Sequence, residues 1–481
     1  MSSKHLNIVY INDVHGYMDL HQELIWQGKR AAFRKAGGYA RIAGLVNEIR
    51  GEKPDNVLFC DGGDTFHGTY PVVESKGEIL IPLLNNLNLD AMTVHWDFAY
   101  GPKVIKGIEE KLNYPILAAN IYYKENRDYF FKPYMVKQIN GLKIGIIGLG
   151  SNIVDKTMPP SFSEGLTFTD GRNEVPKLVE QLRSQEKVDL IILLSHLGFP
   201  QDAKLLSEVQ GIDICLSAHT HNRLYEPVMQ GTTIIVQGGA HGSFLTHLEI
   251  EVEGQKVINF NHRLYEVTPE TPPDLAIEQR VKKALEPFAK ELSTIVGETS
   301  TLLHRGTSIE STMDNFLLQS LIESTGAQIA FSNGWRYGAP IIPGLITLND
   351  LYNIIPMNPP VSVVNLTGKE ILEMLEENLE HTYSSNAFNQ IGGYLKRCFG
   401  LTAFIRIENP KGHRILKLYI GQEELNPDEI YKAAFVTEQG VPLKYGTNRK
   451  NTCIKSIDAM KAFLTKHNPL SVEVQETFIL V

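Results

Sequence analysis

Short apolar runs alternate with amphipathic segments along the first half of the chain. The runs at 6–11, 56–60, 90–94, 115–119, 142–149, 188–194, 212–216 and 234–237 predict buried strands. Helical spacing of apolar residues predicts helices at 37–50, 78–87, 173–186 and 203–209. Because strands and helices alternate, we expect an α/β fold of packed layers, α+β over the whole chain.

A proline-rich segment at 268–273 interrupts this pattern, and a charged amphipathic stretch at 274–292 follows it. We therefore expect a first domain at 1–268, a linker helix within 269–296 and a second domain at 297–481. In the second domain the pattern predicts helices at 313–324 and 368–380. It predicts strands at 328–331, 361–365, 401–407, 416–420 and 430–435.

The composition, 43% apolar and 21% charged residues, is typical of a soluble globular protein. A net charge of -9 gives no reason to expect nucleic acid or an anionic membrane as partner. The four cysteines have no metal-ligand or redox spacing. The N-terminal segment lacks an apolar targeting stretch, and no apolar run could span a bilayer. We expect a cytoplasmic protein unless a leader was removed, and the oligomeric state is left open.

Aspartate and histidine residues recur at the ends of the predicted strands. Imidazole and carboxylate together suit divalent metals such as Mn, Fe, Zn or Co. A single histidine at a strand end is more often a capping or hydrogen-bonding residue, so the hypothesis depends on the whole set. We expect Asp64, in Asp61-Gly62-Gly63-Asp64, to be shared by two metals about 3.5–4 Å apart. The set comprises Asp13, His15, Asp64, His95, His196, His219 and His221.

These motifs resemble those of the dinuclear calcineurin-like metallophosphoesterases, and the two-domain layout resembles the bacterial 5′-nucleotidase superfamily. The resemblance implies a β-sandwich flanked by helices, followed by a 5′-nucleotidase-type substrate domain. It implies one metal on Asp13, His15, Asp64 and His221 and a second on Asp64, His95, His196 and His219. Of the possible metals we favour Mn, with Zn, Fe or Co as alternatives. The motifs are Asp13-x-His15, Gly63-Asp64, the segment 95–101, Ser195-His196-x-Gly198 and His219-Thr-His221.

The third motif departs from the nucleotidase pattern Gly-Asn-His-Glu-Phe-Asp. In this chain it is Val94-His95-Trp96-Asp97-Phe98-Ala99. His95 is a competent metal ligand, but Trp96 and Ala99 replace the His-Asp dyad that assists the transition state in nucleotidases. The His-Trp pair is similar to another branch of the superfamily, the thiosulfohydrolase of the sulfur-oxidation (Sox) system.

Further segments are similar to that branch. From them we expect catalytic roles for Asp64, Trp96 and His241. We also expect the second domain to bind substrate through Arg336, Arg397, Asn333, Trp335 and Tyr337, because a guanidinium matches an oxyanion in a bidentate manner. Without the resemblance, a surface salt bridge would explain either arginine equally well. The segments are Asp61-Gly-Gly-Asp64-Thr65, Gly239-Ala-His241-Gly-Ser-Phe244, Gly334-Trp-Arg336-Tyr-Gly338 followed by Pro343-Gly344 and Ile346-Thr347, and Gly392-Gly393-x3-Arg397-x2-Gly400-Leu401.

The sequence therefore predicts a metal-dependent hydrolase in which a metal-bound hydroxide attacks a phosphorus or sulfur centre. We favour hydrolysis of a small-molecule phosphoester, as in 5′-nucleotidases. The alternative is cleavage of a cysteine S-thiosulfonate on a sulfur-carrier peptide, because a thiolate leaves without the proton that an alkoxide needs. A second alternative is a metal-bearing binding protein with little turnover.

Overall fold

The computed structural model describes residues 3–52, 54–392 and 395–481, so Gly393 of the predicted motif lies outside the described residues. The chain forms two compact units, which we call the first unit (Met1–His21 and Lys35–Pro287) and the second unit (Gln22–Arg34 and Phe288–Val481). This division falls inside helix α8 (Leu275–Leu292) and assigns 22–34 to the second unit, unlike the predicted boundaries. Each unit combines helices and strands, which confirms the predicted mixed α/β class.

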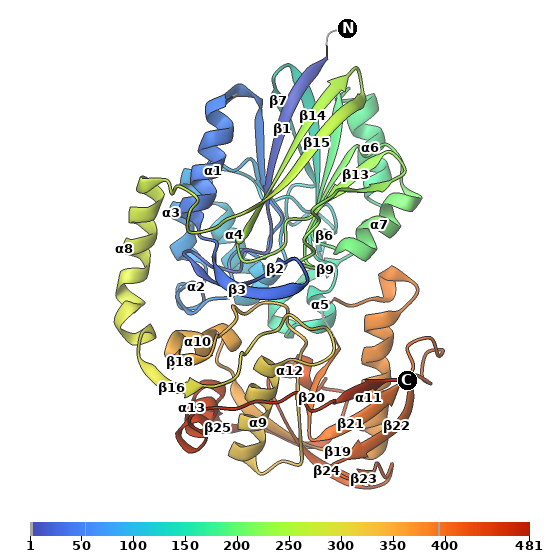
Figure 1. Ribbon diagram of the computed structural model, residues 1–481. Helices are drawn as coiled ribbons and strands as arrows, with labels where there is room; N and C mark the ends of the chain where they lie inside the picture. Colours follow the sequence, from blue (N-terminus) through green and yellow to red (C-terminus); the bar gives the residue numbers. More distant parts are fainter. Residues whose placement is uncertain (1–2, 53, 393–394) are drawn as a thin grey trace. The chain divides into compact units, whose positions relative to one another are not determined.

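Two sheets pack face to face in the first unit (Figure 1). Their shared core contains Ile8 and Leu58 from one sheet and Ile192 and Ile214 from the other, all without exposed surface. The five-stranded sheet has the order β15 (Lys256–Glu266), β14 (Phe244–Glu253), β1 (Lys4–Ile11), β4 (Val57–Asp61), β5 (Ala91–Met92). The six-stranded sheet has the order β12 (Val228–Gln230), β13 (Thr233–Val236), β11 (Ile214–Ser217), β10 (Leu190–Ser195), β8 (Leu142–Leu149), β7 (Tyr134–Ile139).

Helices cover the other face of the five-stranded sheet. Side chains alternate along a strand, so Val9 and Phe59 face away from the inter-sheet core that their neighbours Ile8 and Leu58 join. They belong to a second core with α1 (Tyr39–Glu52), α3 (Ile81–Leu87) and α4 (Pro102–Glu109). Helices α6 (Val175–Ser184) and α7 (Phe199–Glu208) pack against the six-stranded sheet. Helix α6 approaches β8 so closely that the Leu182 side chain lies against Gly145.

Parallel pairing brings the ends of the central strands to the same level. Strand β4 pairs in parallel with β1 and β5, and β10 pairs in parallel with β8 and β11. The last pairs in register are Ile11 with Asp61 and Ser195 with Ser217. The loops after these strands carry the predicted metal ligands, so the pairing alone brings distant parts of the sequence together.

The pattern of apolar runs misplaced some elements of the first unit. The strand predicted at 115–119 is present only as isolated bridges at Ile116 and Leu117. The long strands β14 and β15 were missed because polar residues interrupt their apolar ones. The hairpin β2 (His21–Gln27), β3 (Arg30–Ala36) was also missed, because its apolar stretches are only three residues long. The other elements are β6 (Ile121–Tyr123), β9 (Leu166–Phe168), α2 (Tyr70–Glu74), α5 (Val154–Thr157) and the 3₁₀ helices η1 (Pro54–Asn56), η2 (Glu78–Leu80), η3 (Trp96–Tyr100) and η4 (Pro160–Phe162).

The second unit is built around a five-stranded sheet with the order β20 (Arg397–Phe399), β17 (Ile329–Ser332), β24 (Ile430–Phe435), β19 (Pro360–Thr367), β25 (Thr447–Lys455). A four-stranded sheet has the order β23 (Glu423–Glu424), β22 (Ile415–Ile420), β21 (Leu401–Ile405), β26 (Phe478–Leu480), and β16 (Ile295–Thr299) pairs with β18 (Gly344–Thr347). The helices are α9 (Thr312–Thr325), α10 (Leu348–Ile354), α11 (Gly368–Tyr383), η5 (Ala387–Asn389), α12 (Thr437–Gly440) and α13 (Ser456–Lys466). Among the described residues, we find no helix long and apolar enough to cross a bilayer.

A buried cluster of charges lies at the first turn of α9. Asp314 pairs with Nη2 of Arg305 at 3.0 Å and with Nε of Arg397 at 3.1 Å. The three side chains are at most 4% exposed. Arg305 also donates to the carbonyl of Tyr337, and Arg397 donates to the carbonyls of Thr307 and Ser308. One carboxylate thus holds two loops of this unit through two guanidinium groups.

Asp314→Asn should destabilise the second unit strongly. Loss of the carboxylate charge leaves two buried guanidinium groups without compensation, and breaking such a buried pair costs about 3–5 kcal/mol. Urea unfolding of the full chain should show this loss. The control is Glu377→Gln, which breaks a more exposed ion pair with Lys444 and should cost about 1 kcal/mol or less. Equal losses in the two variants would contradict the structural role of Asp314.

Candidate metal centre

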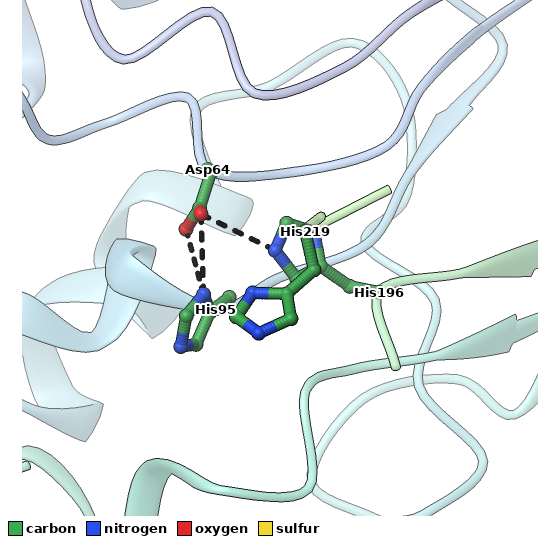
Figure 2. A group of neighbouring side chains, drawn as sticks. All are labelled: Asp64, His95, His196 and His219. Atoms are coloured by element: carbon green, nitrogen blue, oxygen red, sulfur yellow. Dashed lines mark hydrogen bonds and ion pairs between the residues drawn. The ribbon is translucent and has the colours of Figure 1, made fainter. Parts of the chain in front are cut away.

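The loops after β1, β4, β5, β10 and β11 bring all seven predicted ligands together. They form two groups that share Asp64, and within each group the ligand atoms lie within 4.8 Å of one another. We call the first the Asp13 group (Asp13, His15, Asp64, His221) and the second the His95 group (Asp64, His95, His196, His219), which Figure 2 shows. These are the two sets that the sequence resemblance implies.

The side chains of both groups converge on the two carboxylates. Asp64 lies 3.1 Å from Nδ1 of His95, 3.3 Å from Nε2 of His196 and 3.6 Å from Nε2 of His15. Nε2 of His221 lies 3.3 Å from Asp13 and 3.3 Å from Nε2 of His15. Six of the seven side chains are buried, and His221 is half-buried.

Burial and charge act against each other at the shared carboxylate. Burial alone would raise the pKa of Asp64, but the imidazoles of His95 and His196 hold that pKa well below its usual value. Burial lowers the pKa of His15 well below the usual histidine value, which leaves this imidazole neutral and able to bind a metal. A mixed set of imidazoles and carboxylates, buried and convergent, fits a divalent metal ion of borderline softness.

Five of the seven ligands have a left-handed backbone. The φ angles are 52° for Asp13, 51° for His15, 57° for Asp64, 71° for His219 and 56° for His221. Such angles are uncommon outside glycine, although aspartate and histidine adopt them more readily than most residues. Because the conformation turns the chain sharply just after a strand, it directs consecutive ligands toward one point.

Neighbouring groups orient the ligands. Nδ1 of His196 lies 2.6 Å from the carbonyl oxygen of Gly62, so its Nε2 faces the carboxylates. Asn12 donates to Asp13 at 2.6 Å, and the backbone N–H of His219 donates to the same carboxylate at 3.0 Å. Gly63 has a φ of 86°, and a Cβ there would lie 2.6 Å from the Thr93 carbonyl oxygen. Only glycine therefore lets the Asp64 turn approach the chain before His95.

Asp97 fastens the turn that carries Asp64. Its Oδ1 accepts the backbone N–H groups of Thr65 and Phe66, each at 2.9 Å. Its Oδ2 accepts the N–H groups of Asp64 at 3.0 Å and His95 at 2.9 Å. One buried carboxylate thus joins the loop of the shared ligand to the loop of His95. Sequence reasoning missed this role.

Asp202, in the first turn of α7, connects two other ligand strands. Its carboxylate accepts the hydroxyls of Ser195 and Ser217, each at 2.6 Å. Ser195 precedes His196, and Ser217 lies two residues before His219. Asp202 has no exposed surface, and burial raises its pKa to about 7. The sequence carries no signal for this link, since the three residues are joined only by folding.

Two predicted catalytic residues border different ligand groups. The Trp96 ring lies 6.0 Å from the ring of His95, and its backbone N–H donates to Oδ1 of Asp64 at 2.7 Å. The His241 ring lies 6.1 Å from the ring of His15 and 6.0 Å from that of His221. Trp96 is half-buried and His241 is buried. Their catalytic roles stay predictions.

The predicted substrate residues belong to the second unit. Trp335 and Tyr337 are stacked, with ring centroids 6.0 Å apart, and Nε1 of Trp335 donates to Gln439. Asn333 and Arg336 are half-buried in the same segment after β17. Arg397 is only 2% exposed and is engaged with Asp314 and two carbonyls, as described above. Substrate binding by these residues stays a prediction, and Arg397 has an internal structural role that the motif did not indicate.

Comparison with known proteins gives matches in both halves of the chain. The profile of the calcineurin-like phosphoesterase family matches residues 6–223, and that of the 5′-nucleotidase C-terminal domain matches residues 294–437. The trifunctional nucleotide phosphoesterase protein YfkN of Bacillus subtilis is 27% identical over 89% of this chain, which spans 31% of YfkN.

Solved structures show the same fold. The sulfate thiohydrolase SoxB of Thermus thermophilus superposes with a TM-score of 0.92 at 23% identity, covering 99% of this chain and 96% of that one. A 5′-nucleotidase precursor of Thermus thermophilus superposes with a TM-score of 0.88 at 23% identity, covering 99% of each chain. The predicted combination of a calcineurin-like domain with a 5′-nucleotidase C-terminal domain is thereby confirmed.

Asp97→Asn should weaken metal binding without removing a ligand. The amide nitrogen would replace one oxygen and face two backbone N–H groups, which would displace the Asp64 turn. Loss of such supporting contacts lowers metal affinity by about 10–100-fold. Titration of the metal-free protein with Mn²⁺ should show this decrease. The exposed Glu164 supplies the control, Glu164→Gln, whose affinity should match the wild type. Unchanged affinity in Asp97→Asn would contradict the positioning role.

Asp202→Asn should change the pH dependence of stability. The folded protein retains a proton on Asp202 up to a pKa of about 7, whereas an unfolded aspartate has a pKa of about 3.9. This carboxyl therefore favours folding most below pH 4, and its contribution is lost as the pH rises to 7. The measurement is denaturant unfolding of both proteins at pH 5 and pH 8 in the presence of a chelator. Between pH 5 and pH 8 the free energy of unfolding of the wild type should fall by about 1 kcal/mol or more relative to that of the variant. A difference independent of pH would disprove the assignment.

Proposed function

Because the chain belongs to the superfamily of calcineurin-like phosphoesterases with a 5′-nucleotidase C-terminal domain, and is a metal-dependent hydrolase of that superfamily, we propose that it cleaves phosphoesters at a two-metal centre. The observation that carries this proposal is Asp64, whose carboxylate belongs to both ligand groups. A carboxylate in that position is able to bridge two cations.

Two bound cations would activate a water molecule and stabilise the negative charge that develops on the phosphoryl oxygens. The chain contributes fixed geometry. Asp97 holds the Asp64 turn, and Asp202 holds the two strands that carry His196 and His219. With its ligands fixed before substrate arrives, the centre needs little reorganisation during the reaction.

The substrate we propose is a small phosphoester, with nucleotides as first candidates. This choice is supported by relatives named as nucleotide phosphoesterase and 5′-nucleotidase. We also propose Mn²⁺ as the working metal, because the mixed nitrogen and oxygen ligands suit it. The substrate-binding role of Arg336 in the second unit belongs to the same proposal.

A second candidate is cleavage of a cysteine S-thiosulfonate. Trp96 and Ala99 supply neither an imidazole nor a carboxylate at the positions where nucleotidases carry their dyad. A thiolate leaving group, with a pKa near 8.5 for cysteine, departs without help from a proton donor. The similarity in fold to a sulfate thiohydrolase supports this candidate.

The proposal is tested with the Mn-loaded full chain and a panel of substrates. We expect phosphate release from p-nitrophenyl phosphate and from nucleotides, measured by a phosphate assay. Sulfate release from an S-thiosulfonated peptide, without phosphate release from any ester, would favour the second candidate. No turnover with any divalent metal would indicate a binding protein.

Asp64 variants link activity to the shared carboxylate. Asp64→Ala and the isosteric Asp64→Asn should lower kcat by about 10²–10³-fold or more, since several kcal/mol of charge stabilisation are lost. Elemental analysis should find two Mn per wild-type chain and fewer in both variants. Glu164→Gln again serves as the control and should keep full activity and metal content. Fewer than two metals in the wild type would refute the bridging role.

A further inference from the structure

The two ligand groups have neighbours of different chemistry. Beside the Asp13 group lies His241, whose ring is 4.8 Å from that of Tyr17 and 5.9 Å from that of His21. Beside the His95 group lies the indole of Trp96. One border of the centre therefore carries imidazole and phenol side chains, whereas the other carries the aromatic surface of an indole with one N–H.

The Trp96 side chain is held in place by two aromatic neighbours. His67 stacks on the indole at 4.7 Å with an interplanar angle of 26°, and Phe162 contacts it edge-on at 6.4 Å. Aromatic pairs of this kind contribute about 0.5–1.5 kcal/mol each. The backbone N–H of Trp96 is bound to Asp64 at the same time. The indole cannot turn away without losing its contacts with His67 and Phe162.

Only the indole among these aromatic neighbours combines partial exposure with a position next to the metal ligands. His67 has no exposed surface, so it supports the indole and cannot reach a bound molecule. An indole N–H is a hydrogen-bond donor that is not released as a proton at ordinary pH. The indole therefore offers a leaving group a flat, polarisable surface that does not supply a proton.

We propose that the Trp96 indole, held by His67 and Phe162, contacts the leaving group of the substrate. It thereby selects substrates whose leaving group is a weakly basic anion that can lie against an aromatic ring. This inference rests on the proposed phosphoester hydrolysis and specifies its substrate class. Aryl esters have this chemistry, and so do thiol leaving groups. Simple alkyl esters lack it, and so do nucleoside 5′-monophosphates, whose leaving group is an alkoxide. The inference therefore narrows the proposed substrates to phosphoesters with a more acidic leaving group.

The reaction balances without an acid from the protein. A water oxygen forms the new bond to phosphorus, and the bond from phosphorus to the leaving oxygen breaks with its electron pair on that oxygen. One proton of the water passes to bulk solvent, and the other stays on the hydrogen phosphate that is formed. An aryloxide, with a pKa near 10 or lower, departs as the anion, whereas an alkoxide would need a proton in the transition state.

The first test compares kcat/KM for p-nitrophenyl phosphate, phenyl phosphate and glycerol phosphate with the Mn-loaded full chain. General-acid catalysis contributes about 10²–10⁴-fold, so the alkyl ester should be slower than the aryl esters by a factor of that order. Equal kcat/KM for aryl and alkyl esters would overturn the inference while leaving phosphoester hydrolysis intact.

The second test measures binding and does not depend on turnover. Phenylphosphonate and methylphosphonate serve as non-hydrolysable competitors or calorimetric ligands. Phenylphosphonate should bind about two- to tenfold more tightly than methylphosphonate, because one aromatic contact contributes binding energy of that size. Trp96→Leu should abolish this difference, and Trp96→Phe should keep most of it. If no ester is cleaved, the proposed function fails, and this measurement still decides the role of Trp96.

Variants of His67 separate stacking from proton chemistry. His67→Phe keeps a flat ring against the indole and should preserve the preference for phenyl over methyl, whereas His67→Ala should weaken it. Metal content and circular dichroism establish that each variant is folded and loaded. If the preference persists in Trp96→Leu but is lost in His241→Gln, the leaving group faces His241 and our proposal is wrong.

Discussion

The centre depends on one buried carboxylate that lies among imidazoles from several strands. Asp64 is 2% exposed, and an isolated charge at such a place would be strongly destabilising. The nearby His95 and His196 favour its charged form, which holds its pKa low. Its position depends in turn on Asp97, which accepts four backbone N–H groups from the two loops that meet there. The charge of Asp64 and the geometry of the turn that carries it therefore depend on each other.

The same constraint explains the unusual backbone of the ligands. A left-handed conformation in a residue other than glycine costs on the order of 1–3 kcal/mol. Backbone hydrogen bonds between the ligand loops offset this cost: Asp13 donates to Gly63, and His15 donates to Asp64, at 2.9 and 2.8 Å. His241 donates to the carbonyl of Asp13 at 2.8 Å and also has a positive φ. The strain is thus distributed among loops that stabilise one another.

The sequence was sufficient for features that depend on local pattern. Apolar runs located the central parallel strands. Residue type after each strand predicted the side chains that the structure gathers into two groups, because parallel pairing brings strand ends together. Features that depend on distant contacts were not accessible. Asp97 and Asp202 act through loops up to 33 residues away and through serines of two strands, and no spacing marks them. Arg397 matched a substrate motif, yet only the structure shows its pairing with the buried Asp314.

Trp96 shows why a metal centre and a preference for leaving groups can change independently. Its backbone N–H supports Asp64, and every residue except proline could supply that contact. Its indole forms the border of the His95 group, and only the side chain determines what that border offers a substrate. Replacing the side chain therefore alters the chemistry beside the candidate metal centre while the backbone contact with Asp64 is kept. A centre built in this way can retain its ligands and still acquire a different substrate class through one position.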